Sequence, residues 1–203
     1  MSERVIDTLA ALEALFDPVA EASRRKEVSW LHPLYQQMIA ASPFALLATA
    51  GPDGLDVSPR GDAPGFVAVA DERTLLLPER RGNNRIDSLR NLLADPRVAL
   101  LFLIPGVGET LRVNGRARIL ATPTLLERFA VGGAQPRCVL EISVDTVFFQ
   151  CARAIHRAAL WSPIAQRPPV PTPGAILAAL SNGEVGGARY DAELPERIRN
   201  TLY

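Results

Sequence analysis

Residues 95–120 read DPRVALLFLIPGVGETLRVNGRARIL, and this stretch decides the fold. Its almost wholly apolar run, residues 98–104, predicts a central strand of a sheet. The turn residues 105–108 follow, and residues 110–120 then alternate between apolar and polar side chains. Such alternation predicts a long strand with one polar face. The two segments therefore indicate a β-sheet at the centre of the fold.

Strand patterns continue on both sides of this stretch. Residues 51–54, GPDG, are typical of a hairpin turn, and Pro59 is expected to end the short strand that follows it. About six strands with short helices between them favour a mainly β protein with helices (α+β), built on a small antiparallel six-stranded barrel. The further predicted strands are residues 44–50, 55–57, 66–70, 74–77 and 137–149.

Helical spacing of apolar residues is found outside and between these strands. Asn83 is expected to cap the helix over residues 84–94. A proline-rich linker, residues 167–173, precedes a short apolar helix and a charged tail helix. We expect a helical segment at 1–42, a barrel domain at 43–161, and a linker with a helical tail at 162–203. The other predicted helices cover residues 5–16, 33–41 and 152–160.

Composition narrows the possible partners. Lys and Arg number 22, as do Asp and Glu, so no net charge attracts nucleic acid or an anionic membrane, and we expect neither as a partner. Two cysteines are too few for a disulfide framework, and with two histidines no cluster has the spacing of a metal site. The chain has neither a membrane-spanning apolar run nor a signal peptide, so we expect a cytoplasmic protein without a metal.

Two basic segments are the candidates for a binding site. They are SPRGD at 58–62 and RRGNNR at 80–85, and the second precedes a predicted helix. Arginines, amide side chains and free backbone N–H groups at a helix start are the groups that bind a phosphate monoester. The alternative is that these are surface arginines of an Arg-rich chain and that the asparagines only cap a helix. If the segments meet, they form a phosphate site.

Several motifs together resemble a known family. DPRVALLF at 95–102 and RVNGRA at 112–117, with the two basic segments, are similar to the FMN-binding split β-barrel proteins related to pyridoxamine 5'-phosphate oxidase. The resemblance covers about residues 40–161. VSPRGD at 57–62, LW at 160–161 and TLY at 201–203 are similar to an uncharacterised subgroup of that family.

The resemblance implies an FMN-binding split barrel that works as a homodimer, with the flavin in the interface. It implies an oxidoreductase that acts on a small molecule, with NAD(P)H as a possible further partner. Arg60 matches an arginine at the FMN phosphate, and Asn84 and Arg85 stand where the oxidase has arginine and lysine. No catalytic residue is implied. The implied cofactor contacts are Ser58, Arg60, Leu77, Pro78, Asn83, Asn84, Arg85, Thr110, and, toward the partner's flavin, Arg153 and Trp161.

Other functions on the same fold stay open at this point. The deazaflavin F420 could replace FMN as a diffusible cofactor, or the chain could bind flavin or haem without turnover. Pyridoxamine phosphate oxidation is not implied, because the lysine, tyrosine, arginine and serine that hold the oxidase's substrate have no clear match here. The fold does not determine the substrate.

Overall fold

A computed structural model describes residues 5–164, 166 and 168–203 of the chain. Residues 1–4 and Arg167, where the predicted linker begins, lie outside the described residues. The described part contains seven strands, one for each segment with a strand pattern and one more than the expected six-stranded barrel. They are β1 (Phe44–Gly51), β2 (Gly54–Gly61), β3 (Ala68–Asp71), β4 (Thr74–Glu79), β5 (Arg97–Leu103), β6 (Thr110–Leu120) and β7 (Cys138–Gln150).

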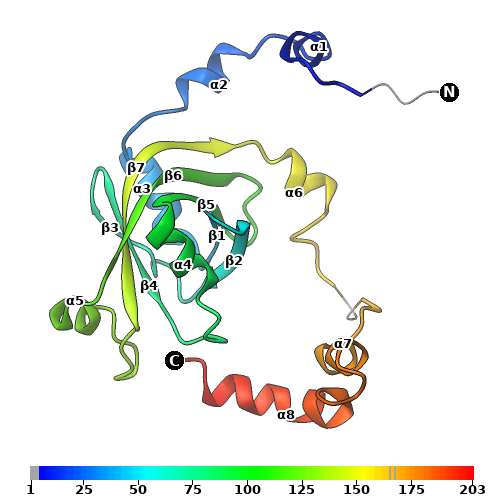
Figure 1. The fold of residues 1–203 in the computed structure, drawn as a ribbon. Coiled ribbons are helices and arrows are strands. Elements are labelled where there is room, and N and C mark those ends of the chain that lie inside the picture. Colours follow the sequence, from blue (N-terminus) through cyan, green and yellow to red (C-terminus); the bar gives the residue numbers. More distant parts are fainter. Residues whose placement is uncertain (1–4, 165, 167) are drawn as a thin grey trace.

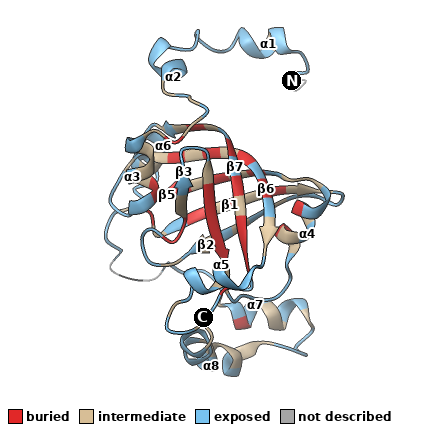
Figure 2. Cartoon of the chain, turned by 90° about the vertical axis from the view of Figure 1, so that its left-hand side faces the viewer, coloured by how far each residue is buried: buried red, intermediate tan, exposed pale blue. Residues whose placement is uncertain are grey.

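The strands form one curved antiparallel sheet, the split β-barrel, with the order β2-β1-β5-β6-β7-β4-β3. Side chains alternate along each strand, so one face of the sheet supplies the core. Leu47, Leu100, Leu111 and Leu140 have almost no exposed surface there. Figure 2 shows this buried face on the central strands, whereas the helices at both ends of the chain are largely exposed.

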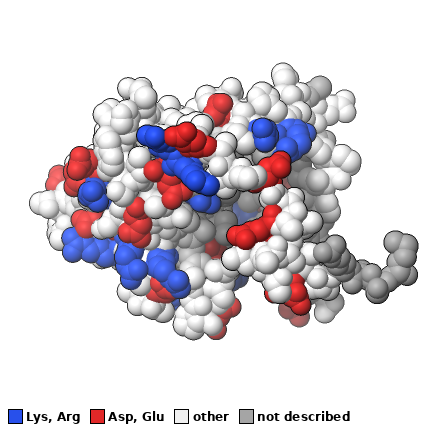
Figure 3. Space-filling view, turned by 90° about the horizontal axis from the view of Figure 1, so that it is seen from above, with Lys and Arg blue, Asp and Glu red and all other residues white. Residues whose placement is uncertain are grey.

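Most helices are shorter than their patterns predict. Only α3 keeps its predicted range, and none of the helices in the described part of the chain is long and apolar enough to cross a membrane. In Figure 1, α1 and α2 extend away from the barrel, and α8 returns toward it. Acidic and basic side chains are interspersed on the face seen in Figure 3. The helices are α1 (Leu9–Glu13), α2 (Glu21–Arg25), α3 (Pro33–Ala41), α4 (Asp87–Ala94), α5 (Pro123–Arg128), α6 (Arg153–Arg157), α7 (Pro173–Leu180) and α8 (Gly187–Asn200).

Strand β2 is longer than predicted, because Pro59 does not end it. Pro59 pairs with Leu46 of β1, and the strand continues to Gly61. Since β2 is an edge strand, the missing N–H of a proline facing the open side costs no ladder hydrogen bond. This extension places Asp56, Ser58 and Arg60 on one face of a single strand, with direct consequences for the site.

A bulge between Asn114 and Gly115 bends the β6–β7 pair. A Cβ at Gly115 would lie 2.2 Å from the carbonyl oxygen of Ser143, so the two backbones approach more closely there than any side chain permits. Bulges of this kind increase local twist and help a sheet to curl. The curvature brings β2, at one edge of the sheet, toward β4 near the other edge.

We therefore expect Gly115→Ala to lower the free energy of unfolding by about 1–3 kcal/mol, the usual cost of overpacking. The clash is with backbone, so no side-chain rotation relieves it. Urea denaturation measures the effect. Gly82→Ala is the matched control, because a Cβ at Gly82 meets nothing within 4 Å. Equal stability of the two variants would contradict the close approach.

The two cysteines are expected to differ in reactivity. Burial, assisted by the negative charge of Glu79 and opposed by Arg60, raises the pKa of the Cys138 thiol to about 11, whereas Cys151 is exposed. At about pH 8 Cys138 is therefore protonated, and a thiolate is the reactive form. Titration with Ellman's reagent should label Cys151 first and Cys138 only on unfolding. If both thiols of the native protein reacted at equal rates, the burial of Cys138 and its raised pKa would be contradicted.

Candidate functional site

Both basic segments line one cleft of about 470 Å³, formed by the ends of β2 and β4 and the loop that leads into α4. We call it the β2–α4 cleft. The two segments that the sequence singles out thus meet in space. Of the predicted cofactor contacts, the cleft is lined by Ser58, Arg60, Pro78, Asn83, Asn84 and Arg85.

One wall of the cleft is a hydrogen-bonded row of polar side chains from β2. Arg60 Nη1 donates to Ser58 Oγ at 2.7 Å, and Ser58 Oγ lies 3.0 Å from Ser88 Oγ in the first turn of α4. Ser88 in turn donates to a carboxylate oxygen of Asp56 at 2.6 Å. Asp56, Ser58 and Arg60 occupy every second position of β2, so their side chains lie on the same face of the strand. The row joins β2 to the start of the helix.

A mostly buried ion pair crosses the cleft from β2 to β4. Arg60 Nε lies 3.0 Å from Glu79 Oε2, and the two side chains are only 14% and 20% exposed. Arg60 Nη1 also donates to the carbonyl of Pro59 at 2.9 Å. These contacts leave Arg60 Nη2 without a hydrogen bond to any described residue, so the guanidinium keeps donors for an anion. The ion pair therefore holds Arg60 in place and leaves some of its N–H groups available to a ligand.

The loop before α4 differs from the prediction, since Asn83 does not cap the helix. Its Oδ1 accepts the N–H of Arg85 at 3.0 Å, and the helix begins only at Asp87, with Ile86 in the capping position. Asn84 and Ile86 both have left-handed backbones, with φ of 59° and 55°, so the segment cannot continue the helix. For β-branched Ile86 this conformation costs about 1–3 kcal/mol.

No side chain of the described residues caps the N-terminus of α4, so its first backbone N–H groups keep their capacity to bind an anion. Strained backbones of this kind cluster at ligand-binding sites. The loop therefore presents backbone donors to the cleft.

Arg85 is the exposed cation of the cleft. Its side chain is 74% exposed and its Nε donates to Asp87 at 2.7 Å, a hydrogen bond that raises the pKa of the guanidinium. Both Nη atoms of Arg85 lack hydrogen bonds within the described residues. Exposed pairs of this kind contribute little to stability, so Asp87 can release Arg85 to a more highly charged anion.

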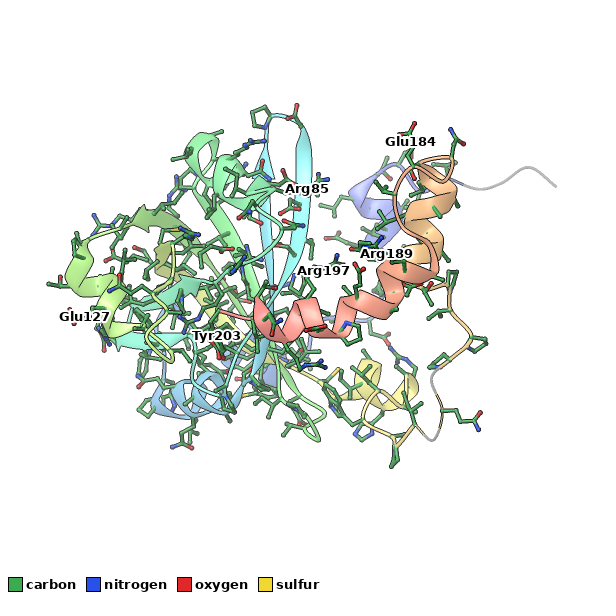
Figure 4. The ribbon with its side chains drawn as sticks, turned by 90° about the horizontal axis from the view of Figure 1, so that it is seen from below. Arg85, Glu127, Glu184, Arg189, Arg197 and Tyr203 are labelled. Carbon is green, nitrogen blue, oxygen red and sulfur yellow. The ribbon has the colours of Figure 1, made fainter. Side chains whose placement is uncertain are left out.

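A second buried pair lies beside the cleft. Arg80 Nε lies 2.8 Å from Asp62 Oδ2, and Asp62 also accepts the hydroxyl of Tyr203 at 2.7 Å. Burial opposes the ionisation of Asp62, but the hydrogen bonds from Tyr203, the Ala63 N–H and Arg80 outweigh it and lower the pKa of its carboxyl. Asp62 is thus ionised at neutral pH and neutralises Arg80. Figure 4 shows Tyr203 beyond the end of α8, against the barrel.

Four predicted contacts lie outside the cleft. The side chain of Leu77 is fully buried in the core, and Thr110 pairs with Gln150 where β6 begins. Arg153 opens α6, and Trp161 Nε1 donates to the carbonyl of Val107 in the turn before β6 at 2.7 Å. Thr110, Arg153 and Trp161 thus belong to one region around that turn and α6. A single chain does not bring this region to the β2–α4 cleft.

Sequence reasoning missed several residues at the cleft. Asp56 could have been found from the alternation of polar residues at 56, 58 and 60, had β2 been extended through Pro59. Glu79 and Ser88 carry no motif, and their role depends on how the sheet curves. Asp62 and Tyr203 are 141 residues apart, and their hydrogen bond forms because α8 brings the end of the described chain back to the barrel.

Comparison with solved structures gives distant similarity. HupZ from Group A Streptococcus is 20% identical, with a TM-score of 0.46 over 57% of this chain and 90% of that one. A proposed pyridoxamine 5'-phosphate oxidase of Lactobacillus delbrueckii is also 20% identical, with a TM-score of 0.46 over 60% and 95%. A FAD-binding protein of Mesorhizobium loti is 19% identical, with a TM-score of 0.41 over 59% and 93%.

The comparison with family models is more decisive. The chain has no significant match among curated proteins. The model of the pyridoxamine 5'-phosphate oxidase family, however, matches residues 31–151, from just before α3 to just after β7. The match includes every strand and the whole β2–α4 cleft. This chain belongs to the pyridoxamine 5'-phosphate oxidase family.

Proposed function

We propose that the chain is an FMN-dependent oxidoreductase of the pyridoxamine 5'-phosphate oxidase class, acting on a small molecule. The observation that carries this proposal is the meeting of both basic segments in the β2–α4 cleft. A phosphate monoester has between one and two negative charges and three acceptor oxygens. The cleft offers matching donors from a strand, a loop and a helix start.

The cleft residues fit a phosphate on specific grounds. Arg60 and Arg85 retain guanidinium N–H groups beyond their contacts with Glu79 and Asp87. The uncapped start of α4 supplies backbone N–H groups, and its dipole favours a negative charge. Ile86 keeps a left-handed backbone, and no side chain of the described residues caps the helix that follows it. A bound phosphate would accept hydrogen bonds from that helix start.

The end of β4 fits the flavin ring. Pro78 lines the cleft, and the backbone between Leu77 and Glu79 runs along it, so apolar surface and backbone groups lie next to the phosphate position. Bound FMN would supply the redox chemistry, exchanging electrons or hydride with the substrate. The chain's own residues would then hold the phosphate, orient the ring and control access. NAD(P)H would be the electron donor for such a site.

A homodimer would complete this site. Edge strand β2 turns its polar side chains toward the cleft and its apolar ones outward, so Leu55 and Val57 are 88% and 62% exposed. An apolar surface of this kind on an edge strand requires cover. A second copy laid against β2 would also lie next to the cleft mouth.

The partner's contribution would come from the region around α6. An apolar groove of about 360 Å³, lined in part by Leu34, Ile104 and Phe149, borders that region at Val107. Nearby on β6, Arg112 Nε is buried without a hydrogen-bond partner in the described part of the chain. In a two-fold dimer, β2 of each copy would face this region of the other. Thr110, Arg153 and Trp161 would then reach the partner's flavin.

The phosphate site is tested by Arg85→Ala. We expect FMN affinity to fall about 10- to 100-fold, the usual loss when a charge-assisted contact to a phosphate is removed. Quenching of flavin fluorescence measures it. The variant should fold normally, because Arg85 is exposed and its ion pair contributes little.

Arg90→Ala is the control for this measurement. Arg90 is an exposed arginine of α4 that does not line the cleft, and its loss should change FMN affinity less than about threefold. Arg60→Lys keeps a cation opposite Glu79 but removes the planar fork, so it should also weaken FMN binding. Unchanged FMN affinity in Arg85→Ala and Arg60→Lys would refute the site. Retention of F420 with no affinity for FMN would replace the proposed cofactor.

The dimer is tested by light scattering during gel filtration. We expect a mass of about 44 kDa, twice the 22.0 kDa of the chain. Val57→Lys should shift the protein toward monomer and weaken FMN binding, because it charges the outer face of β2 without touching the core. Leu93→Glu, at an exposed leucine of α4, is the matched control. A monomeric wild-type protein that binds FMN with full affinity would contradict the proposed interface.

A further inference from the structure

A second, smaller hollow adjoins the β2–α4 cleft. Its volume is about 190 Å³, and Arg80, Arg81 and Arg137 line both cavities, so the two are continuous. Ala134, Gln135 and Tyr203 complete its wall. We call it the Arg137 pocket. No predicted cofactor contact lines it.

The fold places these arginines together at the end of a strand pair. Glu79 of β4 pairs with Cys138 of β7, and the N–H of Arg137 donates to the carbonyl of Glu79 at 3.1 Å. Continuing this register by one step sets Arg80 opposite Arg137. Like charges at opposite positions repel and are unfavourable in a sheet. A negative charge nearby would stabilise this arrangement.

Within the described residues, a carboxylate pairs with only one of the three arginines. Arg80 is paired with ionised Asp62, and its Nη1 donates to the carbonyl of Phe129 at 2.5 Å. The side chains of Arg81 and Arg137, both exposed, make no hydrogen bond or ion pair with any described residue. Two guanidinium groups therefore border one small hollow with their donors free. Paired arginine forks match the geometry of a phosphate group.

Tyr203 gives the pocket its remaining wall. Its hydroxyl donates to Asp62, and its ring lies 5.6 Å from the guanidinium carbon of Arg80. Tyr203 thus contacts both members of the Asp62–Arg80 ion pair. Because Asp62 neutralises Arg80, the charges of Arg81 and Arg137 leave the pocket net positive.

We propose that the Arg137 pocket binds a second phosphate group, next to the flavin phosphate in the β2–α4 cleft. This proposal rests on the proposed function of the cleft. The second phosphate has two possible sources with the same chemistry. It belongs either to a flavin longer than FMN, such as FAD, or to a separate phosphorylated donor such as NADPH.

Isothermal titration of the full-length protein tests the pocket in two arms. In the first arm, FMN and FAD are titrated into wild type, Arg137→Gln and Arg137→Lys. In the second arm, NADPH is titrated into the same proteins saturated with FMN. Arg73→Gln, on the exposed turn between β3 and β4, is the control. Because Arg137 is exposed and its side chain makes no hydrogen bond or ion pair with a described residue, the variants should fold as wild type does.

We expect Arg137→Gln to weaken FAD binding in the first arm, or NADPH binding in the second, about tenfold or more. FMN affinity should change less than about threefold, and Arg137→Lys should recover part of the loss. The arm that responds identifies the source of the phosphate. If wild type binds FMN and Arg137→Gln matches Arg73→Gln in both arms, the second phosphate site is wrong while the cleft stands. A wild type that binds neither FMN nor FAD overturns both.

Discussion

The ion pair between Arg60 and Glu79 is the contact on which the site depends. It joins strands β2 and β4, which lie toward opposite edges of one sheet and meet only because the sheet curls. Both charges are largely withdrawn from water, so removing either one leaves the other buried without a partner, a costly state. The pair thus closes the split of the barrel at the point where the cleft opens. It also fixes the guanidinium from which the row of Ser58, Ser88 and Asp56 begins.

The loop before α4 differs from this ion-paired side of the cleft, because its backbone is strained and few contacts hold it. Ile86 keeps a left-handed backbone, α4 has no side-chain cap, and Arg85 lies mostly in solvent. The left-handed Ile86 and the uncapped helix are unfavourable for folding, whereas the free N–H groups of α4 and the exposed Arg85 favour a bound anion. The rigid side of the cleft therefore comes from the barrel, and the side that adapts to a ligand comes from the loop. This division is common in binding sites built on a rigid scaffold.

Local sequence pattern predicted the elements whose environment is simple. The buried run of β5, the alternation of β6 and the range of α3 follow from periodicity alone. The predicted strand end at Pro59 was wrong, because the effect of a proline depends on whether its strand lies at an edge of the sheet. The predicted helix cap at Asn83 was also wrong, because its side chain accepts the N–H of Arg85 and forms a turn instead of a cap.

The site was predictable only in part. The two basic segments could be recognised, because arginines and amides before a helix carry a chemical signal. The carboxylates that pair with them, Glu79, Asp62 and Asp87, could not be assigned. Two of these pairs form between separate segments after the barrel has curled, and the contact of Tyr203 with Asp62 joins residues 141 positions apart. Long-range contacts of this kind leave no local pattern.

We propose that the β2–α4 cleft recognises the phosphate of a flavin. The most direct measurement compares the affinity of the wild-type protein for FMN and for riboflavin, which differ only by that phosphate. Two or more charge-assisted hydrogen bonds to the phosphate should make FMN bind at least about 100-fold more tightly. Equal affinity for the two flavins, or no binding of FMN, would contradict the account.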